Sequence, residues 1–115
     1  MPLFSVIGLV KNPGNFPYPP DVQYNLMQAL AFAGGLDIAA EPRWATVYRL
    51  KSDGTIVNMP LKIVEGTRLT AASNTPLKAG DIIDVAHTPR TRTNLILQRI
   101  FSVHVGAYVP IWDDD

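Results

Sequence analysis

The chain has 115 residues, enough for one domain with a single hydrophobic core and too few for two. Ten basic and ten acidic residues balance, so the sequence lacks the basic excess on which nucleic-acid binding usually depends. The absence of cysteine excludes disulfides, thiolate metal sites and a cysteine nucleophile.

The first residues predict a strand, a turn and a short return strand. Residues 4–10 are mostly apolar, as in a buried strand. Asn12, Pro13 and Gly14 fit a tight turn with proline in its second position and glycine in its third. Residues 15–18 would return along the edge of the sheet, where proline is tolerated.

The strongest helix signal follows. Asn25 can cap a helix, and Gln28 three residues later completes a capping box. Residues 26–33 are apolar except for Gln28, so we expect this helix to be buried on nearly every side. Gly34 and Gly35 end it, one of them in the left-handed conformation of a helix cap.

The second half of the chain predicts mostly strands. They alternate in polarity or lie next to turn residues such as the Asp53–Gly54 hairpin signal. In chain order we expect a strand at 44–50, its partner at 55–59, a helical turn at 61–64, a loop at 66–74, a turn at 76–81 and a strand at 82–86.

These elements predict an α+β fold of the β-grasp type, a mixed sheet of about five strands with one buried helix packed across it. Residues 1–88 form this domain. Residues 89–115 are interpreted as a linker, a second apolar helix at 95–105 and an acidic tail. No stretch reaches the roughly 18 apolar residues of a membrane-spanning helix, and residues 1–5 do not resemble a signal peptide.

The sequence offers no equipment for catalysis. His87 and His104 have no carboxylate or second histidine at metal-ligand spacing, so they are interpreted as surface or interface residues. Asp53 and Asp81 lie in predicted turns, where aspartate binds local backbone. Phosphate-binding glycine loops and nucleophile motifs are missing. We therefore expect no enzyme activity, no catalytic residue, no metal and no cofactor.

Aromatic rings beside planar polar side chains are typical of carbohydrate-binding surfaces. Tyr18 near Asn12, and Trp44 beside Arg43, fit that description, with core packing or loop covering as the alternative for each ring. A separate group of basic residues could bind lipid phosphate, an acidic polymer or a neighbouring subunit, with a solvated linker as the alternative: Arg90, Arg92 and Arg99.

Three segments carry a family resemblance: VIGLVKNPGNF at 6–16, LMQALAFAGGL at 26–36 and PLKAGDIIDV at 76–85. Together they resemble the SLBB domain, the soluble-ligand-binding β-grasp, over residues 4–87. The resemblance implies a module of a polysaccharide export protein for capsule or exopolysaccharide, located in the periplasm or at the outer membrane.

In that setting the implied partners are polysaccharide and other subunits, with a homo-oligomer in the parent protein and membrane contact only through that parent. The candidate ligand-binding residues are Lys11, Asn12, Tyr18, Arg43 and Trp44. The export domain that precedes SLBB domains in such proteins is absent here. A purely structural oligomerisation module and a DNA-uptake type of SLBB domain remain alternatives, although zero net charge argues against DNA.

Overall fold

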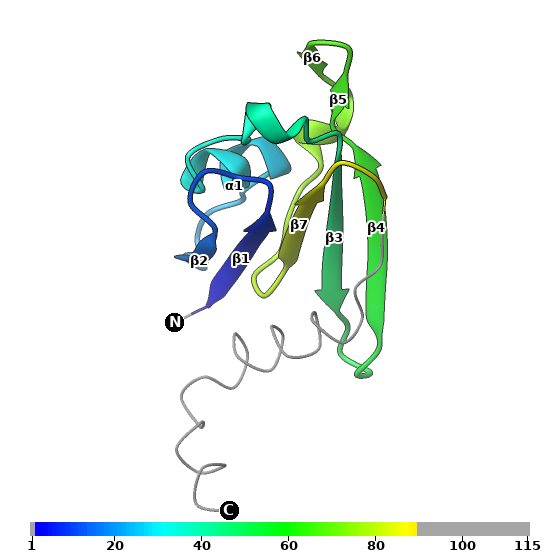
Figure 1. Cartoon of the computed structure of the whole chain (residues 1–115). Helices are drawn as coiled ribbons and strands as arrows, with labels where there is room; N and C mark the ends of the chain where they lie inside the picture. Colours follow the sequence, from blue (N-terminus) through cyan, green and yellow to red (C-terminus); the bar gives the residue numbers. More distant parts are fainter. Residues whose placement is uncertain (1, 90–115) are drawn as a thin grey trace, which may run out of the picture.

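The computed structural model describes residues 2–89, which form a five-stranded mixed sheet with one helix across one face (Figure 1). The strand order is β2-β1-β7-β3-β4; β1 and β7 are parallel, and the other neighbours are antiparallel. The elements of this layer are β1 (Leu3–Gly8), β2 (Gly14–Pro17), α1 (Leu26–Phe32), β3 (Trp44–Leu50), β4 (Ile56–Lys62) and β7 (Ile82–Ala86).

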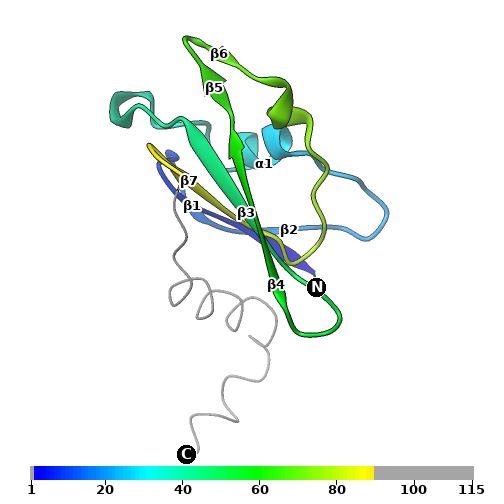
Figure 2. The same ribbon diagram turned by 90° about the vertical axis from the view of Figure 1, so that its right-hand side faces the viewer.

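Three smaller elements complete the fold: a two-stranded hairpin of β5 (Val64–Glu65) and β6 (Arg68–Leu69), and the 3-10 helices η1 (Ile38–Ala40) and η2 (Ala71–Asn74). The hairpin extends beyond the end of the sheet in both views (Figures 1 and 2). The α+β, β-grasp prediction is thus confirmed. The predicted helix at 95–105 lies outside the described residues.

The main core lies between α1 and one face of the sheet. Because side chains alternate along a strand, Phe4 and Val6 of β1 point to the helix face. Leu26 and Ala29 of α1 pack in the same core cluster and are fully buried. A second, smaller cluster occupies the alternate positions of three strands: Ile7, Tyr48 and Ile82.

Both ends of α1 follow the sequence signals. Gln28 donates its backbone N–H to Asn25 Oδ1, and Asn25 donates its own to Gln28 Oε1, each at 2.9 Å. At the other end Gly34 and Gly35 have φ angles of 79° and 91°, a conformation that favours glycine. The Gly35 N–H donates to the Leu30 carbonyl at 2.9 Å, which completes a Schellman-type stop.

The prediction that this helix is buried on nearly every side was wrong. Met27 is 43% exposed and Phe32 41% exposed. The physical reason is that the described part of the chain provides one sheet for the helix to pack on, so its outer side keeps an apolar surface. Phe32 partly compensates by ring contacts, with centroid distances of 5.2 Å to Tyr24 and 5.8 Å to Phe16.

The segment between β1 and β2 also differs from the prediction. Gly14 is the first residue of β2 and does not have a positive φ, so the tight turn predicted from Asn12 does not form. Residues 9–13 instead lie against the end of α1: Lys11 N–H donates to the Gly35 carbonyl at 3.0 Å, and Asn12 N–H to the Ala33 carbonyl at 2.8 Å. These two bonds satisfy carbonyl groups that a helix end leaves without partners.

Residues 61–74 were the least well predicted. The expected helical turn at 61–64 is wrong, because β4 continues to Lys62 and the hairpin starts at Val64. Pro60 does not stop β4, since this strand is at the edge of the sheet. The expected loop at 66–74 instead contains β6 and η2.

Asp81 is buried with a charge partner that the sequence did not reveal. Its carboxylate accepts the Lys78 backbone N–H at 2.8 Å, as predicted for a turn aspartate. It also pairs with Arg49, Nη2 to Oδ2 at 2.8 Å and Nε to Oδ1 at 3.0 Å. These hydrogen bonds raise the pKa of the Arg49 guanidinium above its ordinary value. The pair fixes the end of β3 to the start of β7.

Candidate functional site

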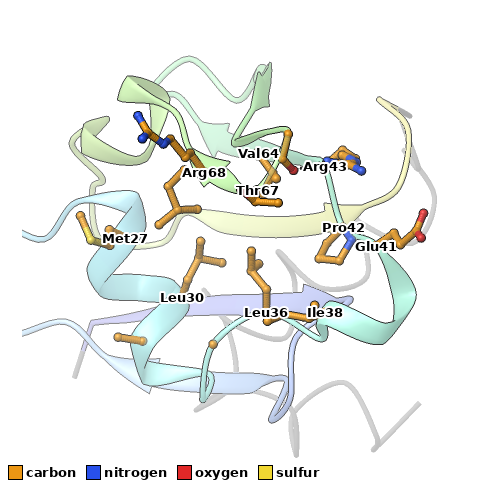
Figure 3. Close-up of a pocket in the computed structure, with 14 residues that line it drawn as sticks. Met27, Leu30, Leu36, Ile38, Glu41, Pro42, Arg43, Val64, Thr67 and Arg68 are labelled. Carbon is orange, nitrogen blue, oxygen red and sulfur yellow. Dashed lines mark hydrogen bonds between the residues drawn. The ribbon is translucent and has the colours of Figure 1, made fainter.

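An open groove of about 710 Å³ lies between the outer side of α1 and the β5–β6 hairpin (Figure 3). Leu30 and Leu36 point into it from the helix side, and Val64 lies across from them on the hairpin side. The complete lining is Met27, Leu30, Ala31, Gly35, Leu36, Ile38, Glu41, Pro42, Arg43, Val64, Gly66, Thr67, Arg68 and Leu69.

The floor of the groove is set by the way the chain leaves α1. The glycine stop at Gly34 and Gly35 reverses the chain, and Leu36 then forms an isolated bridge with Val10. The Asp37 N–H donates to the Leu9 carbonyl at 3.0 Å. These contacts fix the start of η1 beside the helix.

The opposite wall is the hairpin, and Arg43 holds it in place. The Arg43 guanidinium donates through Nη1 to the Gly66 carbonyl at 2.8 Å. Its backbone carbonyl accepts the N–H groups of Ile63 at 2.8 Å and Val64 at 3.3 Å. Because Arg43 also donates its N–H to the Ala86 carbonyl, one residue links the hairpin to the end of the sheet.

Exposed apolar side chains concentrate at this groove. Ile38 is 78% exposed, Leu69 47% and Met27 43%, so three of the six large exposed hydrophobic residues in the described part of the chain line one surface. Scattered exposed hydrophobic residues are normal, but a contiguous patch with polar neighbours is typical of an interaction site.

The rim of the groove is polar with an excess of positive charge. Arg43 and Arg68 carry positive charge there, against the single negative charge of Glu41. On the hairpin, Glu65 is opposite Arg68 and pairs with Lys62 at 2.8 Å. The hydrogen bond from Lys62, and to a smaller extent the charge of Arg43, lower the pKa of the Glu65 carboxyl. The groove therefore favours a ligand with an apolar body and a negative end.

Groups of side chains suited to a metal ion are not found within residues 2–89. No group of three histidine or acidic side chains lies close enough to hold a metal ion. The His87 ring is 2.8 Å from the Glu41 backbone carbonyl, through Nδ1. Within the same range no helix has the length and apolar character needed to cross a membrane.

The five residues predicted to bind ligand do not form one site. Arg43 lines the groove, and Trp44 follows it at the start of β3 with its side chain half-buried. Lys11 and Asn12 are exposed on the loop that contacts the end of α1. Tyr18 is only 5% exposed, and its hydroxyl donates to the Leu77 carbonyl at 2.8 Å and accepts the Tyr24 N–H at 3.1 Å.

Sequence reasoning missed most of the groove. Met27 was assigned to a buried helix, and Val64 and Leu69 to a helical turn and a loop, whereas the predicted burial of Leu30 is confirmed although it also lines the groove. One signal was present: a helix apolar on nearly every side has more apolar surface than one sheet can cover. In this chain that surplus forms one side of the groove.

A mixed sheet crossed by one helix is an α+β architecture of the β-grasp type, and here it has an open groove on the helix side. The family model of the SLBB domain matches residues 3–60, and the chain belongs to this family. SLBB domains are binding and assembly domains, not catalysts, and membership suggests a ligand-binding module. Neither a curated protein nor a solved structure matches the chain.

Proposed function

We propose that the domain is a non-catalytic ligand-binding and assembly module of a bacterial polysaccharide export protein for capsule or exopolysaccharide, working in the periplasm or at the outer membrane. The groove between α1 and the β5–β6 hairpin is the observation that carries this proposal, because it is an open, built surface on a domain of the SLBB family.

Within this proposal the groove serves assembly with another protein subunit. Sugars bind best against flat aromatic rings, whereas the groove is lined by aliphatic side chains such as Leu30, Leu36 and Val64. An apolar centre with arginine at its border is typical of protein–protein interfaces. The rim residues Arg43 and Arg68 provide that border.

Sugar contact is proposed for the polar surfaces outside the groove centre. Lys11 and Asn12 expose a charge and an amide on a loop that two backbone hydrogen bonds hold against α1. A second proposed surface contains the half-buried aromatic ring of Trp44 at the start of β3 and, one residue earlier in the chain, Arg43. Tyr18 is not part of these surfaces, because its ring is buried and its hydroxyl is bonded to the Leu77 carbonyl.

Sedimentation of the full chain with groove variants tests the assembly role. Ile38→Glu and Leu69→Glu place charge at the two most exposed apolar positions of the groove, where the fold itself should tolerate it. Val22→Glu is the matched control, since Val22 is 39% exposed and does not line the groove. Association that weakens only in the groove variants supports the proposal; a monomeric wild-type chain at high concentration contradicts it.

A separate titration tests the polysaccharide. Isotope-labelled chain is titrated with acidic oligosaccharides and followed by NMR, and shifts are expected at Lys11, Asn12 and the Trp44 indole. Absence of shifts at these residues at millimolar ligand would remove sugar contact from the proposal while leaving assembly intact.

A further inference from the structure

The groove favours one kind of occupant, an extended apolar segment that ends in negative charge. Its centre is aliphatic and about 710 Å³ in volume, within the range that holds a few large side chains. Two arginines and one acidic residue line the groove: Arg43 lies beside Glu41, and Arg68 lies on the opposite side (Figure 3). An apolar segment with acidic neighbours would satisfy both features at once.

The chain itself contains such a segment outside the described residues. It is apolar over five positions and is followed directly by three aspartates: Tyr108, Val109, Pro110, Ile111, Trp112, Asp113, Asp114 and Asp115. Pro110 has no backbone N–H, so an extended segment would bring one fewer unsatisfied donor into an apolar groove. The two aromatic side chains offer the largest apolar area for burial.

We propose that residues 108–112 of a second copy of this chain dock in the groove, with residues 113–115 facing Arg68. This inference rests on the proposed assembly role of the groove. A neighbouring molecule has access, because the hairpin wall extends beyond the end of the sheet (Figure 2). A segment of one copy entering the groove of the next is a heterologous contact, which repeats to build a ring or a filament.

Tryptophan fluorescence of the full chain provides the test. The sequence has two tryptophans, so Trp44→Phe leaves Trp112 as the only one. As protein concentration rises, Trp112 emission should shift to shorter wavelength and its quenching by acrylamide should fall. Leu69→Glu should abolish both changes, and Val22→Glu should leave them intact.

Charge exchange tests the orientation. Arg68→Glu should weaken association by about tenfold or more, since it places like charges opposite each other. Adding Asp113→Lys and Asp114→Lys to Arg68→Glu should restore much of the loss. A failure of this restoration would overturn the assigned orientation.

The outcomes separate this inference from the function on which it rests. Trp112 burial that does not change on dilution would show docking within one chain and overturn the second-copy assignment. Trp112 exposed at every concentration, with association still sensitive to Leu69→Glu, would overturn the occupant and leave the assembly role standing. Association insensitive to every groove variant would overturn both.

Discussion

Gly8 and Gly54 allow the steric and conformational roles of glycine to be separated within one fold. Both have φ of +89°, a value that side-chain-bearing residues rarely adopt. A Cβ added at Gly8 would lie 2.1 Å from the Val85 carbonyl oxygen, whereas one added at Gly54 would have nothing within 4 Å. Alanine at either position would therefore have to adopt the same unfavourable positive φ. Only alanine at position 8 would in addition clash with a neighbouring strand.

The magnitudes follow from these contacts. For Gly54→Ala we expect a loss of about 1–2 kcal/mol in the free energy of unfolding, the cost of a left-handed residue. For Gly8→Ala the Val85 carbonyl must also move, and it accepts the Leu9 N–H at 2.9 Å next to the parallel β1–β7 ladder. Leaving those groups unpaired adds about 1–3 kcal/mol.

Urea unfolding followed by circular dichroism measures both variants against the wild-type chain. Gly8→Ala should be less stable than Gly54→Ala by about 1–3 kcal/mol, the additional cost of unpaired buried backbone groups. Equal losses of stability in the two variants would show that the close approach of β1 to β7 at Gly8 adds no free-energy cost. That result would refute the steric explanation for glycine at position 8.

Three further predictions concern polar contacts. Asn25→Ala removes the capping-box hydrogen bond that the Gln28 N–H donates to Asn25 Oδ1, while the backbone N–H of residue 25 can still donate to Gln28 Oε1, and should cost about 1 kcal/mol in urea unfolding. Arg49→Met leaves the fully buried Asp81 carboxylate without its charge partner and should cost about 3–5 kcal/mol; adding Asp81→Asn should recover part of the loss, and no recovery would contradict a buried-charge cause. Hydrogen bonds from the Thr55 hydroxyl and amide lower the pKa of Asp53, so its stabilisation is present above its ordinary pKa and lost as pH falls through the lowered one. The stability difference between wild type and Asp53→Asn should therefore be larger at about pH 7 than at about pH 2, and equal differences would argue against this role.

Features that depend on local interactions between neighbouring residues were predicted well from the sequence. The capping box at Asn25, the stop at Gly34 and the hairpin turn at Gly54 each depend on a few consecutive residues, and all three formed as expected. The strands at 44–50 and 82–86 have the predicted bounds, because their apolar pattern matches burial in the centre of the sheet.

Contacts between distant residues could not be predicted in this way. Arg49 and Asp81 are 32 residues apart, and only the pairing of β3 with β7 brings them together. The walls of the groove come from residues 27–43 and 64–69, which sequence patterns assign to separate elements. Tyr18 is a further example. The sequence suggested a candidate surface ring, but the hydrogen bond from its hydroxyl to the distant Leu77 carbonyl accounts for its buried position.

The Lys11–Asn12 loop and the Gly34–Gly35 helix end form one structural unit, joined by backbone hydrogen bonds. Gly34 has φ of +79°, which favours glycine, and a Cβ there would displace the Asn12 side-chain amide and lie 3.3 Å from Lys11 Cβ. The loop amides in turn donate to the Ala33 and Gly35 carbonyls, which directly follow α1. The family match covers this unit and ends at residue 60, before the β5–β6 hairpin begins. The matched part of the domain thus supplies β1, β2, β3, most of β4, the helix and one wall of the groove, whereas β7 lies outside it, as do residues 64–69, which form the other wall. Under the proposed assembly role, partner selectivity at the groove should depend on the β5–β6 hairpin, because residues 64–69 can change without altering the contacts between the Lys11–Asn12 loop and the end of α1.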